Sequence, residues 1–572
     1  MIAETPSLRR RLLQVDGHTK RALDVGRTRL LVTGLVFACA FAVIGLRVLH
    51  VAVLGSDGPA PLARSEVARP HLAQRADIVD RAGRVLATTL PTPSLYANPR
   101  EIRDPERAAQ RIVRVLPDLS QGRVAARLGM DRGFVWLKRD LGPRQQVAVN
   151  NLGIPGLYFR QEERRFYPQG DLTAHVIGFT DIDNRGLAGI ERSFDKLLRD
   201  RHSPLRLSLD LRVQHVLVDE LSRAMAGFDG TGAAGVIMDA TTGELVALAS
   251  LPAFDPNSPG AASQEARFNR AALGVYEMGS VFKIFTVASV LDSGAVKLHD
   301  RFDVSEPIRI GGYAIRDFKP KDGKLTVPEI FMHSSNIGTV RMALAGGSAL
   351  QRRTLRRLGL TSPTHVELPE VGRPMVPSPW REINTMTISY GHGLAITPLQ
   401  LTAAVAATVN GGVLPRPTLL AQAAGRQPEG RRVFDRETSA TMRQLLRLVV
   451  TYGTGGKAAV PGYRVGGKTG TADKLRGGRY DGDSRIASFV GAFPIDDPAY
   501  VVFAMIDEPQ GTERSFGYAT GGWVAAPAVR RIIARAGPML GVTPQAPAQV
   551  PAEENHPLLV RVKANARAAN TP

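Results

Sequence analysis

The stretch YEMGSVFK, Tyr276–Lys283, places a lysine three residues after a serine that itself follows a glycine. A serine hydroxyl is a weak nucleophile near neutral pH and needs a base to take its proton. Gly279 and Ser280 open a predicted helix, and residues three apart on a helix share one face. Lys283 is therefore predicted to reach the Ser280 hydroxyl. Partial burial and a cationic neighbour would lower the pKa of Lys283 and let it act as a neutral base.

The S-x-x-K pattern alone is weak evidence, because a second copy occurs at Ser193–Lys196. That copy lies in GIERSFDKLLRD, which we interpret as a solvated, charged helix before a domain boundary. Two further motifs favour Ser280. The only S-x-N, Ser334-Ser335-Asn336, follows 54 residues after Ser280, and the only K-T-G, in VGGKTGTAD, begins at Lys468 another 134 residues later.

This ordered set of three motifs resembles the signature of penicillin-binding proteins and serine β-lactamases. Other stretches are similar to class B penicillin-binding proteins, among them RFYPQGDLTAHVIGFTDIDNRGLAGIE and SYGHGLAITPLQLTAAVAATVNGG, and the resemblance covers about residues 25–535. It is closest to the cell-division group, since S-S-N at Ser334 differs from the S-x-D of elongation-type relatives. One departure is Arg81-Ala82-Gly83, where the family usually has R-N-G.

The resemblance implies a role for each residue of the first two motifs. Ser280 would attack the carbonyl between the two terminal D-alanines of a peptidoglycan stem peptide, and Lys283 would take its proton. Ser334 would relay a proton to the departing D-alanine. Asn336 would bond the amide backbone of the substrate.

The resemblance also assigns the third motif to substrate binding. Lys468, with Thr469 and Thr471, would hold the terminal carboxylate on an edge strand, and Gly470 would let the substrate approach that strand closely. The backbone N–H groups of Ser280 and Thr471 would form the oxyanion hole.

Several residues near these motifs are expected to have structural roles. Ser335, Tyr276 and Glu277 are interpreted as structural, and Asn269-Arg270 as a support for the site. Arg485 is interpreted as a solvated charge.

Composition limits the possible partners and cofactors. Lysine and arginine outnumber aspartate and glutamate, 73 against 53, but they are spread along the chain without a zinc-finger spacing or a long basic block. Nucleic acid is therefore not expected as a partner, whereas an anionic surface such as lipid headgroups is. The single cysteine, Cys39, excludes a disulfide within the chain, and the scattered histidines argue against a metal site. No metal and no cofactor are expected.

An apolar segment near the N-terminus predicts a membrane anchor. Leu30–Leu46 is a run of 17 residues without a charge, and its apolar character continues to Leu54. About 20 apolar residues span a bilayer. The basic residues before it indicate that residues 1–29 stay in the cytoplasm. We expect an uncleaved single-pass anchor over 30–54 in the bacterial inner membrane, rather than a signal peptide or a lipoprotein acylated at Cys39.

The exported part is predicted to hold two domains and a tail. Residues 55–205 are expected to form an elongated α+β pedestal, beginning with the strand–turn–strand ADIVDRAGRVLATTL. Residues 206–536 contain two strong hairpins with long helical stretches between them, which favours an α/β domain with an antiparallel sheet covered by helices. The resemblance implies the transpeptidase fold of penicillin-binding proteins, similar to serine β-lactamases. Residues 537–572 are Pro/Ala-rich and are expected to be disordered.

The resemblance implies a transpeptidase that cross-links the nascent septal wall, on peptidoglycan strands derived from lipid II, and that β-lactams inhibit. Residues 55–205 are too few for a glycosyltransferase, so a SEDS glycosyltransferase of the FtsW type is expected as a partner, with other divisome membrane proteins. Three alternatives stay open: an elongation-type class B transpeptidase, a β-lactamase, and a membrane β-lactam sensor or divisome scaffold without turnover. The β-lactamase is disfavoured because no Glu-x-x-Leu-Asn loop is found.

Overall fold

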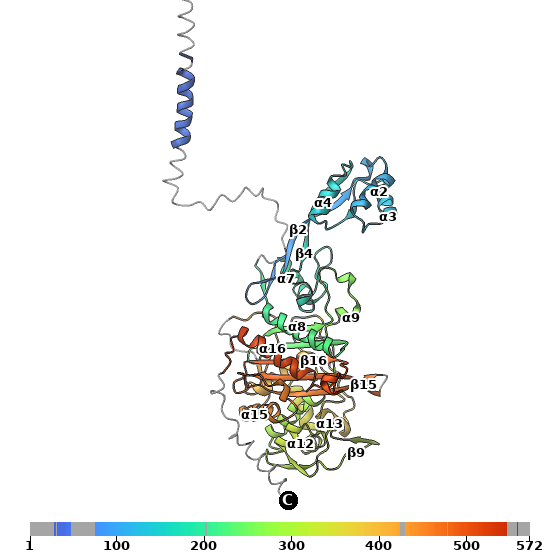
Figure 1. Cartoon of the computed structure of the whole chain (residues 1–572), viewed down its shortest axis with the longest axis vertical. Helices are drawn as coiled ribbons and strands as arrows, with labels where there is room; N and C mark the ends of the chain where they lie inside the picture. Colours follow the sequence, from blue (N-terminus) through green and yellow to red (C-terminus); the bar gives the residue numbers. More distant parts are fainter. Residues whose placement is uncertain are drawn as a thin grey trace, which may run out of the picture. The chain divides into compact units, whose positions relative to one another are not determined.

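The computed structural model describes residues 28–29, 31–46, 75–200, 203–423, 430–476, 479–545 and 558, and it divides into two units, Met1–Leu72 and Ala73–Pro572 (Figure 1). In the first unit, residues 28–29 and 31–46 are helical and exposed. No helix among the described residues is both long enough and apolar enough to cross a membrane. Most of the predicted cytoplasmic tail and residues 47–54 lie outside the described residues, so the anchor stays a prediction.

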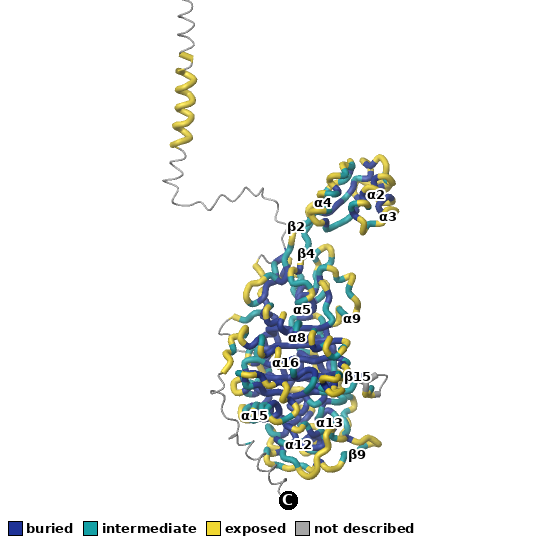
Figure 2. The backbone as a smooth tube through the Cα atoms, viewed as in Figure 1, coloured by how far each residue is buried: buried dark blue, intermediate teal, exposed yellow. Residues whose placement is uncertain are grey.

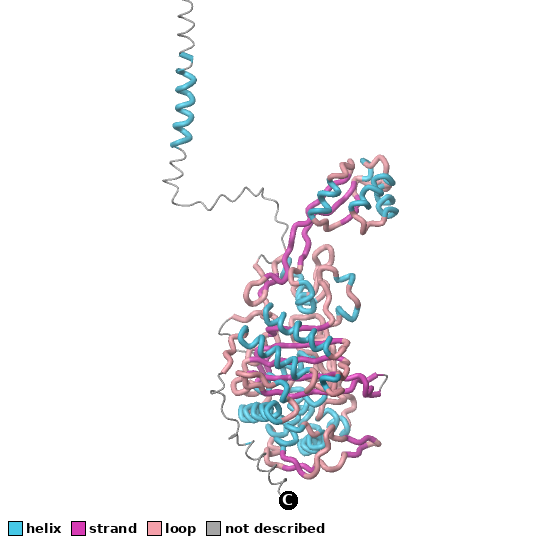
Figure 3. The backbone as a smooth tube through the Cα atoms, viewed as in Figure 1, coloured by secondary structure: helices cyan, strands magenta, loops and turns pink. Residues whose placement is uncertain are grey.

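A five-stranded antiparallel sheet forms the middle layer of the catalytic half of the second unit, in the order β14-β15-β16-β6-β7 (Figure 3). Its strands are β6 (Gly232–Asp239), β7 (Leu245–Leu251), β14 (Gly466–Arg476), β15 (Arg479–Phe493) and β16 (Tyr500–Asp507). Both hairpins expected from the sequence are present, and β16 joins them by pairing with β6. Strand β14 lies at the edge, so one side of its backbone is not paired within the sheet.

Helices cover both faces of this sheet, because side chains alternate between the two faces along each strand. Ile237 and Val502 point to the face that packs on α8 and α16. Their neighbours Val236 and Phe503 point to the other face, under α10, α14 and α15. The helices are α8 (Leu211–Gly227), α10 (Lys283–Asp292), α14 (Pro398–Val409), α15 (Arg436–Tyr452) and α16 (Ala525–Met539). The dark blue strands of Figure 2 show this buried middle layer, which confirms the predicted sheet flanked by helices.

Shorter elements complete the catalytic half. They are η4 (Gly279–Phe282), β8 (Arg301–Asp303), β9 (Ile308–Ile310), β10 (Tyr313–Ile315), β11 (Lys324–Thr326), α11 (Val327–His333), α12 (Asn336–Arg357), α13 (Glu382–Ser389), β12 (Val413–Pro415) and β13 (Gly430–Arg432). The hairpin β9–β10 is held by a small core in which Ile315 meets Val340 of α12 and Met386 of α13. This hairpin leads directly into the segment that contacts the second motif.

The part of the second unit before residue 206 begins with the predicted strand–turn–strand. The Asp80 carboxylate closes the turn by accepting hydrogen bonds from the backbone N–H groups of Ala82 and Arg84, both at 2.8 Å. The elements are β1 (Ile78–Val79), β2 (Val85–Ala97), α2 (Pro105–Val115), α3 (Gln121–Leu128), β3 (Val135–Lys138), α4 (Pro143–Asn150), β4 (Leu157–Phe166), α5 (Ala174–Ile177), α6 (Gly189–Ser193), α7 (Asp195–Asp200) and β5 (Leu205–Arg206).

Two hydrophobic cores divide this part of the chain. Residues between Leu95 and Phe159 form a core of their own, in which helices α2, α3 and α4 cover strands β2 and β3. By contrast, Ile78, Leu86 and Ile190 belong to the same core as the catalytic sheet. The predicted pedestal therefore contains one lobe with a separate core and one segment that packs on the catalytic half.

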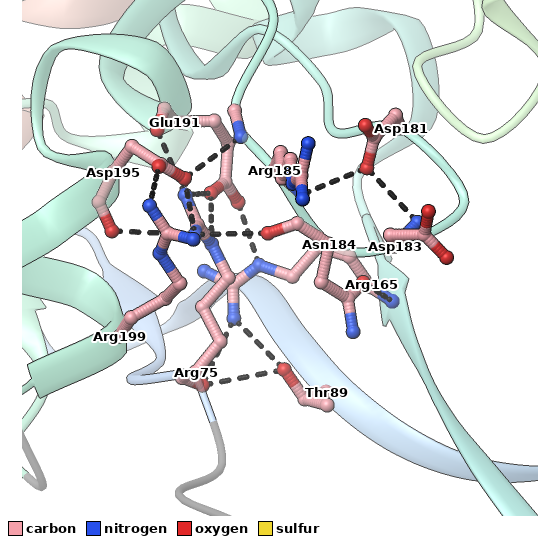
Figure 4. Close-up of polar contacts among 11 residues, drawn as sticks. Arg75, Thr89, Arg165, Asp181, Asp183, Asn184, Arg185, Glu191, Asp195 and Arg199 are labelled. Carbon is pink, nitrogen blue, oxygen red and sulfur yellow. Dashed lines mark hydrogen bonds and ion pairs between the residues drawn. The ribbon is translucent and has the colours of Figure 1, made fainter.

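A buried ion network ties this segment together (Figure 4). The Glu191 carboxylate is fully buried and accepts hydrogen bonds at 2.6 Å from Nε of both Arg75 and Arg165. Arg75 also contacts Asp195 at 2.8 Å. The interpretation of residues 189–200 as a solvated helix is therefore wrong at Glu191, because the arginines supply the charge that allows its burial. Ser193 and Lys196 are exposed and lie on different helices.

The end of the catalytic half lies beyond the predicted boundary at residue 536. Helix α16 continues to Met539, the Tyr463 hydroxyl donates to the Val542 carbonyl at 3.0 Å, and the Gln545 N–H donates to the Gly462 carbonyl at 2.7 Å. Of the predicted tail after Gln545, only Leu558 is among the described residues.

Candidate active site

The candidate nucleophile lies at a tight turn that is pressed against the edge strand. Gly279 has a φ of +54°, and a Cβ at this position would lie 2.3 Å from the Thr471 carbonyl oxygen. Its N–H donates to the Gly391 carbonyl at 3.1 Å. Only glycine fits such a left-handed, crowded position without strain. The turn therefore fixes Ser280, at the start of η4, beside β14.

Lys283 is fully buried, and the oxygen atoms around its Nζ are uncharged: two hydroxyls, a backbone carbonyl and a side-chain amide. Its Nζ lies 3.0 Å from Ser280 Oγ, 2.6 Å from the Ser334 carbonyl oxygen and 2.7 Å from Asn336 Oδ1. Burial lowers the pKa of Lys283 well below its ordinary value, and the charge of Lys468 lowers it further, while Asp317 opposes both. A neutral amine has two N–H groups and one lone pair. The two acceptor-only oxygens take the N–H groups, which leaves the lone pair for the Ser280 hydroxyl.

The second motif is shaped by a break between two helices. Helix α11 ends at His333, and Ser334 then takes a left-handed conformation with φ 61° and ψ 40°. Ser335 starts α12 as its N-cap, accepting from the Gly338 N–H at 3.0 Å. This geometry turns the Ser334 hydroxyl toward Lys283, at 3.1 Å from its Nζ. The expected structural role of Ser335 is thus visible as a helix cap.

Asp317, which no motif indicates, holds the second motif in place. Its carboxylate accepts from Ser335 Oγ at 2.6 Å, from the Ile337 N–H at 3.0 Å, and from the Asn336 N–H. The preceding carbonyl, of Arg316, accepts from Asn336 Nδ2 at 2.9 Å, which directs Oδ1 toward Lys283. A carboxylate on the first N–H groups of a helix is favourable electrostatically. The loop after β10 is therefore part of the site.

The third motif lies on edge strand β14. Lys468 is fully buried, and its Nζ lies 2.9 Å from Ser334 Oγ. Burial lowers the pKa of Lys468 to about 7. The side chains of Thr469 and Thr471 point to the opposite face, where Thr469 Oγ1 lies 2.9 Å from Thr454 Oγ1 and Thr471 Oγ1 accepts from the Gly521 N–H at 3.1 Å.

Gly470 has a packing role in addition to the predicted role in substrate approach, which stays a prediction. A Cβ at this position would lie 2.3 Å from Ser488 Oγ and 2.6 Å from the Met278 carbonyl oxygen. Both atoms belong to the protein itself, on β15 and on the turn before the nucleophile. The glycine therefore lets β14 approach the nucleophile turn, and this contact accounts for it without a substrate.

The structure brings the predicted catalytic residues together. Ser280, Lys283, Ser334, Asn336 and Lys468 form one chain of contacts of 3.1 Å or less. The predicted oxyanion donors are adjacent in space, since a Cβ on Gly279 would lie 3.2 Å from the Thr471 backbone nitrogen.

Two residues outside the motifs, Asn269 and Arg485, have polar partners within the protein. The Asn269 side chain accepts from the N–H groups of Ala271 and Ala272 and donates to the His175 carbonyl. Arg485, interpreted as solvated, is partly exposed and pairs with Asp473 at 3.0 Å. No group of three or more His, Cys, Asp or Glu side chains in the described part of the chain is arranged to hold a metal ion.

Known protein families match both halves of the second unit. The penicillin binding protein transpeptidase domain matches residues 233–534, which include all three motifs, and the penicillin-binding protein dimerisation domain matches residues 70–210.

Individual relatives match along most of the chain. A probable peptidoglycan D,D-transpeptidase FtsI of Caulobacter vibrioides is 43% identical over 482 residues, 82% of each chain. Peptidoglycan D,D-transpeptidase FtsI of Escherichia coli is 33% identical over 491 residues, 79% of this chain and 81% of the relative. The solved structure of penicillin binding protein 3 from Mycobacterium tuberculosis with ampicillin has a TM-score of 0.66 at 27% identity, covering 84% of this chain and 98% of that one. With its dimerisation and transpeptidase domains and an intact three-motif site, the chain belongs to the class B penicillin-binding proteins.

Proposed function

We propose that this protein is a peptidoglycan D,D-transpeptidase, which cross-links stem peptides through an acyl-enzyme on Ser280 and releases the terminal D-alanine. The observation that carries the proposal is the contact of 3.0 Å between Ser280 Oγ and the fully buried Nζ of Lys283. Relatives named peptidoglycan D,D-transpeptidases FtsI, and a relative solved with ampicillin, support the same activity.

Acylation begins when neutral Lys283 takes the proton of Ser280. The lone pair of its amine faces the hydroxyl because Ser334 O and Asn336 Oδ1 occupy its N–H groups. Ser280 Oγ then attacks the carbonyl carbon of the penultimate D-alanine. The backbone N–H groups of Ser280 and Thr471 would donate hydrogen bonds to the carbonyl oxygen and stabilise the negative charge that develops on it. Each donor contributes a factor of about 10²–10³ in rate.

The departing D-alanine needs a proton on its nitrogen. Ser334 Oγ lies within hydrogen-bond distance of both Lys283 and Lys468, so it can give its own proton and be reprotonated from a lysine. Lys468 on one face of β14, with Thr469 and Thr471 on its other face, would bind the terminal carboxylate of the donor at the edge of that strand. In this role the cation of Lys468 positions the substrate and does not act as the base.

The second half-reaction distinguishes a transpeptidase from a β-lactamase. An amine from a neighbouring stem attacks the acyl-enzyme, and the new amide is the cross-link. Class A β-lactamases use a glutamate to activate water instead. Three glutamates lie in the region where such a loop would be. Glu367 accepts from Thr418 Oγ1 and from the Leu419 N–H, each at 2.7 Å, Glu370 accepts from the Gly189 N–H at 3.2 Å, and Glu382 is exposed at the start of α13. None of the three has a hydrogen bond to a motif residue in the described part of the chain.

Division of the cell is the process we propose for this activity. The S-S-N motif and the FtsI relatives support septal synthesis, with elongation as the alternative. We further propose the anchor over 30–54, a pedestal over 55–205 and a catalytic domain over 206–536 outside the inner membrane. A SEDS glycosyltransferase of the FtsW type would supply the strands, because residues 55–205 are too few for a glycosyltransferase domain.

Reconstitution tests the proposed reaction. The full chain, in detergent with a SEDS polymerase and lipid II, is expected to yield cross-linked stem peptides and free D-alanine in equal amounts, measured by chromatography and mass spectrometry. Ser280→Ala should abolish both products while uncross-linked strands persist. Release of D-alanine with hydrolysed stems alone would favour a carboxypeptidase or β-lactamase, and neither product from the wild type would favour a sensor or scaffold.

A further inference from the structure

Glu277, three residues before the nucleophile, is a half-buried carboxylate that no cation neutralises in the described part of the chain. Its Oε1 accepts from the Gly393 N–H at 2.8 Å, and the Tyr480 hydroxyl lies 3.1 Å from Oε2 and 3.3 Å from Oε1. Both partners are neutral. Burial raises the pKa of Glu277, while the hydrogen bonds from the Gly393 N–H and the Tyr480 hydroxyl lower it. A desolvated carboxylate without a positive partner is unfavourable, and a bound cation would relieve it.

The groups around Glu277 are also neutral. The ring of His392 lies 5.5 Å from that of Tyr480 and 5.2 Å from that of Tyr390. Burial lowers the pKa of His392 to about 4, so the imidazole is uncharged at physiological pH. Its Nδ1 is buried and finds no hydrogen-bond partner among the described residues. Asp473, a charged residue on the edge strand β14, is paired with Arg485 at 3.0 Å.

These residues lie beside the nucleophile turn. Residues 391–393 run along 277–279, joined by hydrogen bonds from the Gly279 N–H to the Gly391 carbonyl and from the Gly393 N–H to Glu277. Tyr480 comes from β15, which pairs with the edge strand β14. Glu277 therefore bridges the nucleophile turn and the hairpin that continues the third motif.

The second substrate of a transpeptidase is an amine, which is an ammonium ion near neutral pH. The cation of Lys468 repels such an ammonium ion, so the ammonium ion needs an anionic site away from Lys468 but close to Ser280. We propose that Glu277 is that site, and that it binds the ammonium group of the acceptor stem peptide, with Tyr480 and His392 lining it. This inference rests on the proposed transpeptidase function and adds a residue for its acceptor.

The chemistry balances without any further reactant. The acceptor ammonium, bound to the Glu277 carboxylate, loses one proton to solvent and becomes a neutral amine. Its nitrogen attacks the acyl carbonyl carbon and forms the new C–N bond. The nitrogen passes its second proton to Lys283, and Lys283 gives a proton to Ser280 Oγ as the ester C–O bond breaks. Glu277 holds the acceptor in place and is not consumed.

A purely structural role for Glu277 predicts different behaviour. Glu277→Gln keeps an oxygen that can accept from the Gly393 N–H and from Tyr480, so it preserves the fold contacts while removing the charge. If Glu277 only supports the turn, this change affects every nucleophile alike. If it binds an ammonium ion, the change affects charged amines and spares a nucleophile that is neutral near physiological pH, such as hydroxylamine.

The experiment measures how the acyl-enzyme partitions between aminolysis and hydrolysis. The full chain receives a D-alanyl-D-alanine stem-peptide donor and either a stem peptide with a free side-chain amine or hydroxylamine, and products are counted by mass spectrometry. For Glu277→Gln, the ratio of aminolysis to hydrolysis should fall about 10- to 100-fold with the stem amine, the value of one charge-assisted hydrogen bond. The ratio with hydroxylamine should change less than about 3-fold. Glu382→Gln, at an exposed glutamate, is the matched control and should behave as the wild type.

Labelled-penicillin acylation of each variant separates the two hypotheses. A wild type that forms no Ser280 adduct contradicts the proposed function, whereas an acylating enzyme whose partition is unchanged in Glu277→Gln contradicts only the acceptor site. Equal losses with both nucleophiles, or loss of acylation in Glu277→Gln, also overturn it, because Glu277 would then be structural. Tyr480→Phe keeps the carboxylate and should retain the preference for the stem amine; a loss as large as in Glu277→Gln would contradict the role of the charge.

Discussion

Lys283 and Lys468 place their Nζ atoms 3.1 Å and 2.9 Å from one shared atom, the hydroxyl oxygen of Ser334. Both lysines are fully buried, and among the described residues no carboxylate contacts either Nζ. Two ammonium ions so close together are unfavourable in a dry environment, so one of them gives up its proton. Burial lowers the pKa of both, and the mutual repulsion lowers that of Lys283 further. This relationship supports the proposed division of roles, with Lys283 as the base and Lys468 as the cation.

Arginine substitutions test that division. Lys283→Arg should reduce the rate of acylation by labelled penicillin about 10²–10⁴-fold, because a guanidinium does not serve as a base and general-base catalysis contributes about that much. Lys468→Arg should lose less, since a guanidinium still binds a carboxylate. Stopped-flow fluorescence with a reporter penicillin gives both rates. Equal losses would mean that the two lysines are not distinguished as proposed.

The pH dependence of acylation tests the coupling between the lysines. Acylation requires neutral Lys283, so its rate should rise with pH through the pKa of that residue. Lys468→Met removes the neighbouring charge that lowers this pKa. The pKa of Lys283 then rises, and the acidic limb of the rate profile should move to higher pH. A limb that stays in place, or moves to lower pH, would show that Lys468 does not act on Lys283.

Asp317 should have the opposite effect on the same profile. Its charge raises the pKa of Lys283, so Asp317→Asn should move the acidic limb to lower pH. The maximal rate should also fall about 10-fold or more, because charge-assisted hydrogen bonds to Ser335, Asn336 and Ile337 are weakened. Asp322→Asn, at an exposed position of the same loop, is the control. A fall in the maximal rate without any shift of the acidic limb would show that Asp317 only positions the second motif and does not change the pKa of Lys283.

Gly470→Ala tests the contact between the edge strand and the nucleophile turn. The added methyl would lie 2.6 Å from the Met278 carbonyl oxygen, so β14 must move away from the turn. Overpacking of this kind costs about 1–3 kcal/mol, and both the unfolding temperature and the acylation rate should fall. Gly482→Ala, in the same hairpin, meets nothing within 4 Å and should be neutral in both measurements. Normal acylation by Gly470→Ala would show that the contact is not needed.

The sequence predicts this site well where function depends on motif residues, and poorly where it depends on the partners that position them. The three motifs identify Ser280, Lys283, Ser334, Asn336 and Lys468, and alternating apolar residues identify the hairpins of the sheet. Asp317 carries no such signal, because two of its partners are backbone N–H groups that any sequence supplies and the third, the Ser335 hydroxyl, is 18 residues away in the chain. The burial of Glu191 also escapes detection, since its arginine partners are 26 and 116 residues away in the chain.

Gly470 shows a different limit. A glycine in an edge strand indicates a close approach, but the pattern does not say what approaches. The structure identifies atoms of β15 and of the nucleophile turn, so this residue supports the fold of the site, and its role in substrate approach stays a prediction. The atoms that approach Gly470 come from residues far apart from it in the sequence, so the sequence pattern alone does not identify them.

Intact-mass spectrometry with a labelled penicillin tests the central claim most directly. Ser280 is the serine of the S-x-x-K motif in the complete three-motif set, and its hydroxyl lies 3.0 Å from Lys283 Nζ, so the wild type should carry one covalent adduct, mapped by peptide analysis to the segment that contains Ser280. Ser280→Ala should carry none, while its far-ultraviolet spectrum and unfolding temperature match those of the wild type. An adduct that persists in folded Ser280→Ala, or that maps to Ser193 or Ser334, would contradict the assignment of Ser280 as the nucleophile.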